Sequence, residues 1–311
     1  MRVVLTNARV MLSFLSCSKP PKFSGTTMTH PMQSKKILIT GGNGGIGFET
    51  AKALIAQGAD VVIASRASAK TDAALAALGP SARHLAVDLS DLESVRGLAD
   101  AYLAEHAQLD VLINNAGLFP TQQQLTQQGF EMQFGVNHLS HFLLTQLLLP
   151  LMLGQPSARI VTVSSMLHQK GKLDFASLKG SAKYSGQRAY GQSKLANVLF
   201  AIELANRLSG TQVTSNVLHP GGVATDIVRD LPWPIRKLLG LIFITPEAGA
   251  KTSILLATDP ALNQTTGTYF DQCVIKTPSA SAQDPLLRSQ LWEYSLEAVG
   301  LKTDLFMPTL N

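Results

Sequence analysis

The run Lys36-Ile-Leu-Ile-Thr40 leads directly into Gly41-Gly-Asn-Gly-Gly45-Ile46-Gly47, and this stretch decides the fold. Its first part is an apolar run of strand length, and a helical pattern follows at residues 48–57. Glycines between a strand and a helix allow a tight turn and let backbone N–H groups approach a phosphate at the helix N-terminus. A turn that only joins the two elements is the competing interpretation, but the strand before it and the helix after it favour a phosphate site.

The alternation of strand and helix repeats along the chain. Strands are expected at residues 36–40, 61–65, 85–88, 111–114, 159–164 and 214–218. Helices are expected at residues 48–57, 70–78, from a capping box at Ser90 to Glu93 onwards to about 106, and at 130–153, 186–208 and 247–257. The strands are continuous apolar runs, as parallel strands buried on both faces require. The pattern predicts an α/β fold with a doubly wound parallel sheet, in a single domain over residues 35–311.

Composition and charge exclude several classes of protein. With 45% apolar and 15% charged residues among 311, the chain is too apolar to be disordered, and two cysteines cannot build a disulfide scaffold or a four-cysteine zinc site. The net charge of +5 comes mainly from residues 1–34, which hold four basic and no acidic residues. The remainder is nearly neutral, so nucleic acid is not expected as a partner.

Residues 1–34 permit three interpretations: a signal peptide, an organellar transit peptide, or an upstream stretch included by a mis-called start, with Met28 or Met32 as the true start. We favour a disordered leader or a mis-called start. The longest apolar stretches, Leu143–Leu153 and Leu238–Ile244, are shorter than a bilayer requires, so no transmembrane span is expected. We therefore expect a cytoplasmic protein, with organellar targeting by the leader and peripheral membrane contact as alternatives.

The end of the second strand carries information about the cofactor. A site for NAD commonly has Asp or Glu there to bind the ribose hydroxyls, whereas this chain has Ser65-Arg66. An arginine pairs with a 2′-phosphate through charge-assisted hydrogen bonds, and a carboxylate would repel that phosphate. The sequence therefore favours NADP, unless Arg66 is only a solvated loop residue.

Tyr190 and Lys194 are four residues apart on an expected helix and so share one face. An ammonium beside a phenol favours the phenolate, which predicts a tyrosine pKa lowered from about 10 towards the working pH. Such a tyrosine is a candidate proton donor to a carbonyl that is being reduced. Taken alone, however, this spacing is common in amphipathic helices.

Taken together, the motifs resemble the short-chain dehydrogenase/reductase family over about residues 35–275. The motifs that carry this resemblance, in family order, are Thr40-Gly41 to Gly45-Ile46-Gly47, Asn114-Asn115-Ala116-Gly117, Asn137, Ser164-Ser165, Tyr190 to Lys194, and Pro220-Gly221. The segments Phe134 to Phe142, Arg159 to Ser165 and His219 to Val223 are similar to the retinol-dehydrogenase-like branch. The resemblance implies a Rossmann-type fold.

The resemblance also implies a role for each catalytic position. Tyr190 is expected to be the general acid/base, with Lys194 lowering its pKa and binding the nicotinamide ribose. Ser165 is expected to bind the substrate carbonyl, with Ser164 as its rival, and Asn137 to hold a water in a proton relay. The residues expected to bind the cofactor are Gly41, Gly45, Ile46, Gly47, Ser65, Arg66, Asp88, Leu89, Asn115, Ala116, Gly117, Tyr190, Lys194, Pro220, Val223 and Thr225.

Other features carry weaker signals. Residues 227–244 include Trp233 and resemble the family's substrate lid, although a surface helix or a contact with one membrane leaflet is an alternative. The apolar helix around Leu143–Leu153 and the Tyr190 helix resemble a subunit interface, so a homodimer is possible. His138 and His141 lack further ligands at suitable spacing and are expected to be structural, with no metal site.

The sequence therefore predicts an NADP(H)-dependent oxidoreductase that interconverts a lipophilic alcohol and its aldehyde or ketone. Two alternatives remain open. One is a double-bond reductase similar to the light-dependent protochlorophyllide reductase, which shares the tyrosine and lysine. The other is a non-catalytic NADP-binding regulator, because a fold alone does not determine function.

Overall fold

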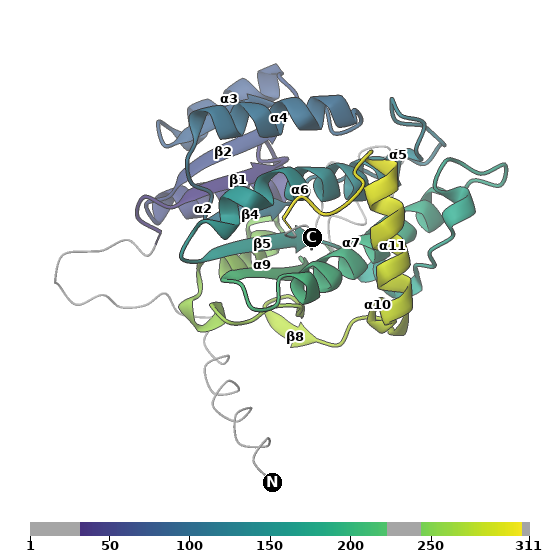
Figure 1. The fold of residues 1–311 in the computed structure, drawn as a ribbon. Helices are drawn as coiled ribbons and strands as arrows, with labels where there is room; N and C mark the ends of the chain where they lie inside the picture. Colours follow the sequence, from purple (N-terminus) through teal and green to yellow (C-terminus); the bar gives the residue numbers. More distant parts are fainter. Residues whose placement is uncertain (1–31, 223–243, 307–311) are drawn as a thin grey trace, which may run out of the picture. The chain divides into compact units, whose positions relative to one another are not determined.

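The computed structural model describes residues 32–222 and 244–306. Within them, eight strands form one sheet in the order β3-β2-β1-β4-β5-β6-β7-β8 (Figure 1). The strands are β1 (Lys36–Thr40), β2 (Asp60–Ser65), β3 (Ala82–Ala86), β4 (Val111–Asn114), β5 (Ala158–Val163), β6 (Val213–His219), β7 (Tyr269–Asp271) and β8 (Val274–Lys276). All neighbours pair in parallel except β7 and β8, which are antiparallel. The predicted doubly wound, Rossmann-type sheet is confirmed.

Helices cover both faces of this sheet (Figure 1). One apolar cluster joins the sheet to α2 (Gly45–Ala56), α3 (Ala69–Leu78) and α9 (Pro246–Thr258). The cluster on the other face includes α4 (Leu92–Glu105), α6 (Ser140–Leu153), α7 (Gly186–Arg207) and α11 (Pro285–Ala298). The shorter helices are α5 (Met132–Phe134), η1 (Gly135–Leu139), η2 (Met166–Lys170), η3 (Phe175–Ser177), η5 (Pro260–Leu262) and α10 (Ala280–Gln283).

The order of the strands determines the edge of the sheet at which a ligand is expected to bind. Because β1 and β4 are neighbours while β2 follows β1 in the chain, the strand order reverses between β1 and β4. Ligands of such sheets bind outside the carboxyl ends of the strands at this switch point. Those ends carry Thr40, Asn114, Val163 and His219, and the segments that follow them hold most of the predicted site residues.

Two local predictions were wrong. The third strand covers Ala82–Ala86 rather than residues 85–88, because it is an edge strand whose half-exposed face accepts Arg83 and His84. The predicted capping box is absent from α4: the N-cap is Asp91, whose carboxylate accepts from the backbone N–H of Glu93 at 3.1 Å. Continuous apolar runs therefore locate the buried central strands correctly, but they misplace a strand at the edge of the sheet.

Among the described residues, one helical stretch, Met132–Leu153, is long and apolar enough to cross a membrane by length and composition. The apolar stretch noted in the sequence, Leu143–Leu153, is only the second half of this helical stretch. However, 78% of its most apolar window is buried inside the protein, as in the core helix of a globular domain. Such burial makes the stretch weak evidence for a membrane span.

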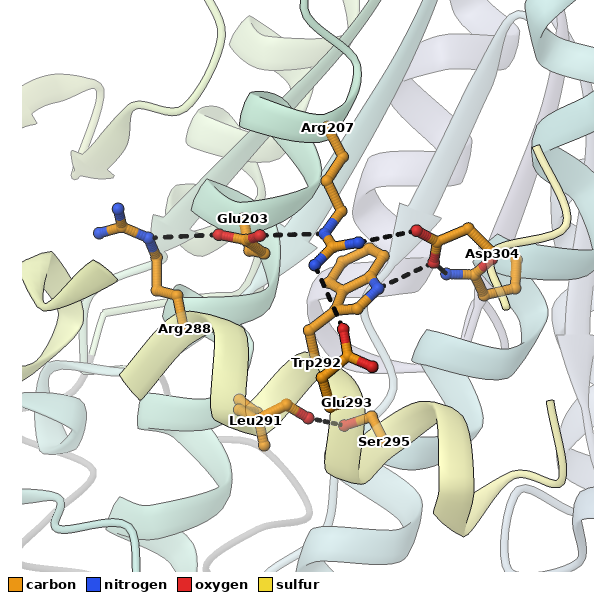
Figure 2. A network of polar contacts seen from close by, with 9 residues as sticks. Glu203, Arg207, Arg288, Leu291, Trp292, Glu293, Ser295 and Asp304 are labelled. Carbon is orange, nitrogen blue, oxygen red and sulfur yellow. Dashed lines mark hydrogen bonds and ion pairs between the residues drawn. The ribbon is translucent and has the colours of Figure 1, made fainter. Parts of the chain in front are cut away.

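A network of polar contacts joins α7 to α11 and to the chain that follows it (Figure 2). Arg207 donates to Glu203 at 2.9 Å and to Asp304 at 2.8 Å, and its guanidinium lies 4.5 Å from the ring of Trp292. Asp304 also accepts from the indole N–H of Trp292 at 2.8 Å and from Gln146 at 3.1 Å. We call this set of five residues the C-terminal clamp.

Candidate active site

The glycine turn between β1 and α2 has the geometry of an anion site. Gly41 has a φ of +69°, which favours glycine, and a Cβ at Gly47 would overlap the carbonyl oxygen of Gly41. The N-cap of α2 is Gly44, so no side chain there occupies the first N–H groups, and the first turn carries no acidic residue. A helix N-terminus with these features fits the pyrophosphate of a dinucleotide.

Thr40 fastens the turn after β4 to the glycine turn. Its hydroxyl accepts from the backbone N–H groups of Asn115 and Ala116, both at 3.0 Å, and lies 2.8 Å from Nε2 of His141. The Asn115 amide in turn donates to the Thr40 carbonyl at 2.8 Å. The predicted residues Asn115 to Gly117 therefore lie beside the glycine turn, although the sequence analysis gave no role to His141 here.

The end of β2 brings positive charge towards this turn. Arg66 is exposed, whereas Ser65 is buried and its hydroxyl lies 3.2 Å from that of Thr71. Lys70, in the first turn of α3, is a residue that the sequence analysis missed. A Cβ added at Gly44 would come within 2.6 Å of its Nζ, so this ammonium lies beside the turn. The signal was present in the sequence, because Lys70 lies four residues after Arg66, at the start of the helix expected at residues 70–78.

The remaining predicted cofactor residues lie at other strand ends. Asp88 is exposed and accepts from the backbone N–H of Ser90 at 2.9 Å, while Leu89 packs partly against the core. Pro220 follows β6 and is buried. Val223, Thr225 and the predicted lid at 227–244, apart from Ile244, lie outside the described residues.

Tyr190 and Lys194 share a face of α7, as their spacing predicts. Both are buried, and the lysine Nζ lies 5.6 Å from the centroid of the tyrosine ring. Burial raises the pKa of Tyr190 to about 12, opposed by a hydrogen bond with the Ser165 side chain. Burial also lowers the pKa of Lys194 to about 8. The predicted lowering of the tyrosine pKa from about 10 is wrong for the chain's own groups, because desolvation of the phenol raises it.

The two serines after β5 are in different environments. Ser164 is buried, and its hydroxyl donates to the backbone carbonyl of Lys194 at 2.7 Å. Ser165 is half-buried, and its hydroxyl accepts from the N–H of Leu167 at 3.2 Å and bonds with Tyr190. Ser165 is therefore the serine whose hydroxyl meets the phenol.

Asn137 lies in the π-helical turn η1, a local widening that is frequent at functional sites. Its amide donates to the carbonyl of Leu118 at 3.1 Å and to Ser193 at 3.0 Å, and its Oδ1 accepts from Leu118 N–H at 2.9 Å. A Cβ at Gly117 would lie 3.3 Å from the Lys194 Nζ and 3.4 Å from the Asn137 Oδ1. Both side chains therefore border Gly117.

Phe119 completes the surroundings of the phenol and was not predicted. Its ring meets that of Tyr190 edge to face, with the centroids 5.0 Å apart and the planes at 87°. Aromatic packing of this kind holds a ring in one orientation. The geometry thus gathers a phenol, a hydroxyl and an ammonium at the carboxyl edge of the sheet, near a turn suited to a dinucleotide, which is what proton transfer beside a hydride transfer requires.

Comparisons with known proteins agree with this geometry. A family model described as short chain dehydrogenase matches residues 35–233. Retinol dehydrogenase 14 of Homo sapiens is 42% identical over 294 residues, which cover 87% of this chain and 88% of that protein. A crystal structure of an uncharacterized protein from Mycobacterium paratuberculosis has a TM-score of 0.73 at 33% identity, covering 89% of this chain and 98% of that one.

A further solved structure holds a nucleotide. It comes from Beutenbergia cavernae, is assigned to an NAD(P)-dependent gluconate 5-dehydrogenase and has bound NADP. It is 26% identical with a TM-score of 0.65, and the match covers 78% of this chain and 97% of that chain. The family model covers more than half of the chain, and the retinol dehydrogenase aligns along most of it. The chain therefore belongs to the short-chain dehydrogenase family of oxidoreductases and is similar to its retinol dehydrogenases.

Proposed function

We propose that the protein is an NADP(H)-dependent oxidoreductase that interconverts a lipophilic alcohol and its aldehyde or ketone, with Tyr190 as the acid/base. The observation that carries this proposal is the contact between the Tyr190 and Ser165 hydroxyls, beside the buried Lys194. These groups follow β5 and lie on α7, at the edge where ligands of such sheets bind.

The charge states suit a proton donor in the reduction direction. A phenol with its pKa raised to about 12 stays protonated at neutral pH, so it has a proton to give. Lys194, with its pKa lowered to about 8, is mostly charged at pH 7 and stabilises the phenolate that remains. Ser165 donates to the substrate carbonyl oxygen and orients it towards Tyr190. A nicotinamide dinucleotide, when bound, supplies the hydride.

Arg66 and Lys70 support NADP over NAD. Both are cations near the end of β2, where a carboxylate would bind the ribose hydroxyls of NAD. Two cations at this place favour an additional phosphate. The Beutenbergia structure with bound NADP shows that a relative of this fold accepts that nucleotide.

The lipophilic substrate is proposed from the relatives. Retinol dehydrogenase 14 is named for an apolar polyene alcohol, and it is similar to this chain along most of its length. A panel of aldehydes and ketones of graded chain length, with NADPH as reductant, tests this part. Activity that rises with chain length supports it, and activity limited to short polar carbonyls contradicts it.

Tyr190→Phe tests the function as a whole. The substitution removes the hydroxyl and keeps the ring, which packs against Phe119. We expect loss of turnover by about a thousandfold, with an unchanged dissociation constant for NADPH measured by fluorescence. Unchanged turnover would remove the mechanism. NADPH binding by the unsubstituted protein without turnover of any carbonyl on the panel would instead favour the non-catalytic regulator.

A further inference from the structure

His168 lies three residues after the serine that meets the catalytic phenol, and it is completely buried. Its Nδ1 lies 2.7 Å from the backbone carbonyl oxygen of Ser165, and the backbone N–H of Ser279 donates to its Nε2 at 3.3 Å. A carbonyl oxygen only accepts and an amide N–H only donates. The ring is therefore neutral, with its proton on Nδ1.

The surroundings of His168 maintain this state. Burial lowers its pKa, and the opposing influences are its hydrogen bond with Ser165 and the charge of Asp271 on β7. The centroid of the ring also lies 4.8 Å from that of Tyr269, which is two residues before Asp271 on β7, and the two ring planes are at 55°. His219 on β6 lies close enough for the two imidazoles to influence one another. The neutral ring is packed on several sides.

We propose that His168 is a positioning residue for Ser165, and that the Ser279 backbone N–H selects the tautomer with its proton on Nδ1, which this role requires. The hydrogen bond from Nδ1–H fixes the Ser165 carbonyl, and with it the direction in which the Ser165 hydroxyl faces Tyr190. The N–H of Ser279 requires an acceptor at Nε2, which places the proton on Nδ1. The segment between β8 and α10, 111 residues away in sequence, thereby takes part in organising the catalytic serine.

This inference rests on the proposed role of Ser165 and is tested with two nearly isosteric variants. In His168→Asn, the side-chain amide lies where Nδ1 was and keeps the donor to Ser165. In His168→Gln, the amide lies near the former Nε2 and loses that donor. We expect kcat/KM for a carbonyl substrate to stay within about threefold in His168→Asn and to fall by about a hundredfold in His168→Gln, because small displacements of a reacting group are costly.

The same pair in a Ser165→Ala background shows whether His168 acts through the serine. We expect the difference between the Asn and Gln variants to disappear there, because no hydroxyl is left to orient. Melting temperature and NADPH affinity, measured alongside, should be alike in the two variants. Equal kcat/KM for the two variants, or a difference that persists without Ser165, would overturn the proposal.

The tautomer itself is measured by ¹⁵N NMR of the imidazole nitrogens, with His168→Asn to assign the signals of this ring. We expect Nδ1 of His168 to resonate as a protonated nitrogen and Nε2 as an unprotonated one at pH 7 and above, as the contacts with Ser165 and Ser279 require. A proton on Nε2 would contradict the selection.

Tyr190→Phe, measured in the same assay, separates the two levels of inference. Retained turnover in that variant refutes the proposed function itself. Lost turnover in Tyr190→Phe together with equal Asn and Gln variants at position 168 refutes only the role of His168.

Discussion

Burial acts on Tyr190 and Lys194 in the same sense, because it disfavours the charged form of each. It raises the pKa of the phenol to about 12 and lowers that of the ammonium to about 8. The pair is therefore arranged as an acid at neutral pH, with a proton on the oxygen and a positive charge 5.6 Å from the ring. The sequence predicts that these residues meet, but the sign of the tyrosine shift depends on burial, which follows from packing across the whole sheet.

Arg66→Glu tests the cofactor preference at the level of one side chain. The exposed arginine stands where a carboxylate would select NAD, so reversing its charge should repel the 2′-phosphate. We expect the dissociation constant for NADPH to rise by about a hundredfold and that for NADH to change less than about threefold. Fluorescence titration with each nucleotide measures this. Lys302→Glu, an equal charge change at an exposed site, is the control, and equal weakening of both nucleotides by Arg66→Glu would contradict NADP preference.

Residues that lie in a contiguous pattern or in a family motif could be predicted, and residues linked only by contacts between distant parts of the chain could not. The glycine turn is predictable because the strand, the turn and the helix that make it are contiguous in sequence. His168 has one partner three residues away and another at Ser279, and no periodicity links those positions. Thr40 and His141, 101 residues apart, are a second pair of this kind. Such contacts depend on the order of strands in the sheet.

At the scale of elements, the close approach of η2 to α7 holds the serine loop against the catalytic helix. Gly171 ends η2 with φ −66° and ψ 142°, which alanine tolerates, yet a Cβ there would overlap the carbonyl oxygen of Gly191 and lie 2.9 Å from the Cβ of Leu195. The glycine is therefore required for space and not for backbone conformation.

Gly171→Ala should separate these two elements. We expect the free energy of unfolding to fall by about 2 kcal/mol and kcat/KM to fall by about tenfold, because the displaced loop carries Ser165. Gly97→Ala in α4 is the matched control, since a Cβ there meets nothing within 4 Å, and it should stabilise the fold by about 1 kcal/mol. Urea unfolding and steady-state kinetics provide both readouts. Unchanged stability and unchanged kcat/KM in Gly171→Ala would show that η2 moves to accept the added Cβ at no cost and would contradict this prediction.

Prediction of elements from sequence was best in the middle of the sheet. Central strands β1, β4 and β5 are buried runs whose apolar residues mark them, whereas β3 is half exposed and was misplaced. The short strands β7 and β8 and the helix α11 were not predicted. Three-residue strands carry too little pattern, and α11 mixes polar and apolar residues because it packs on α7 while its other side faces solvent.

At the scale of the whole molecule, two buried histidines connect the fold to pH. Burial lowers the pKa of His138 to about 3 and that of His141 to about 4. The unfolded chain, with histidine pKa near 6.5, therefore binds more protons than the folded chain below that pH, so stability is complete above pH 6.5 and decreases as the pH falls.

We expect each of these two histidines to reduce the free energy of unfolding by about 1.4 kcal/mol per pH unit between pH 6 and pH 5. His138→Gln should remove one such contribution from the pH slope, measured by urea unfolding at a series of pH values. The variant also loses the contact of His138 with Ser295 at 2.9 Å, so its stability at pH 7.5 is the reference. An unchanged slope would contradict a neutral, buried His138.

The C-terminal clamp makes the segment around Asp304, after α11, part of the fold without making it part of the site (Figure 2). Asp304 is 7% exposed and accepts from Arg207, Trp292 and Gln146, so Asp304→Ala leaves three donors without their acceptor. We expect the free energy of unfolding to fall by about 3 kcal/mol. Arg207 is thirteen residues beyond Lys194 on α7, about 20 Å along the helix axis, so kcat/KM of the folded enzyme should stay within about twofold.

Asp284→Ala, which removes an exposed helix cap at the start of α11, is the control and should cost only about 1 kcal/mol. A large loss of kcat/KM in Asp304→Ala at a temperature where the protein is folded would instead mean that α7 transmits the state of the clamp to Tyr190.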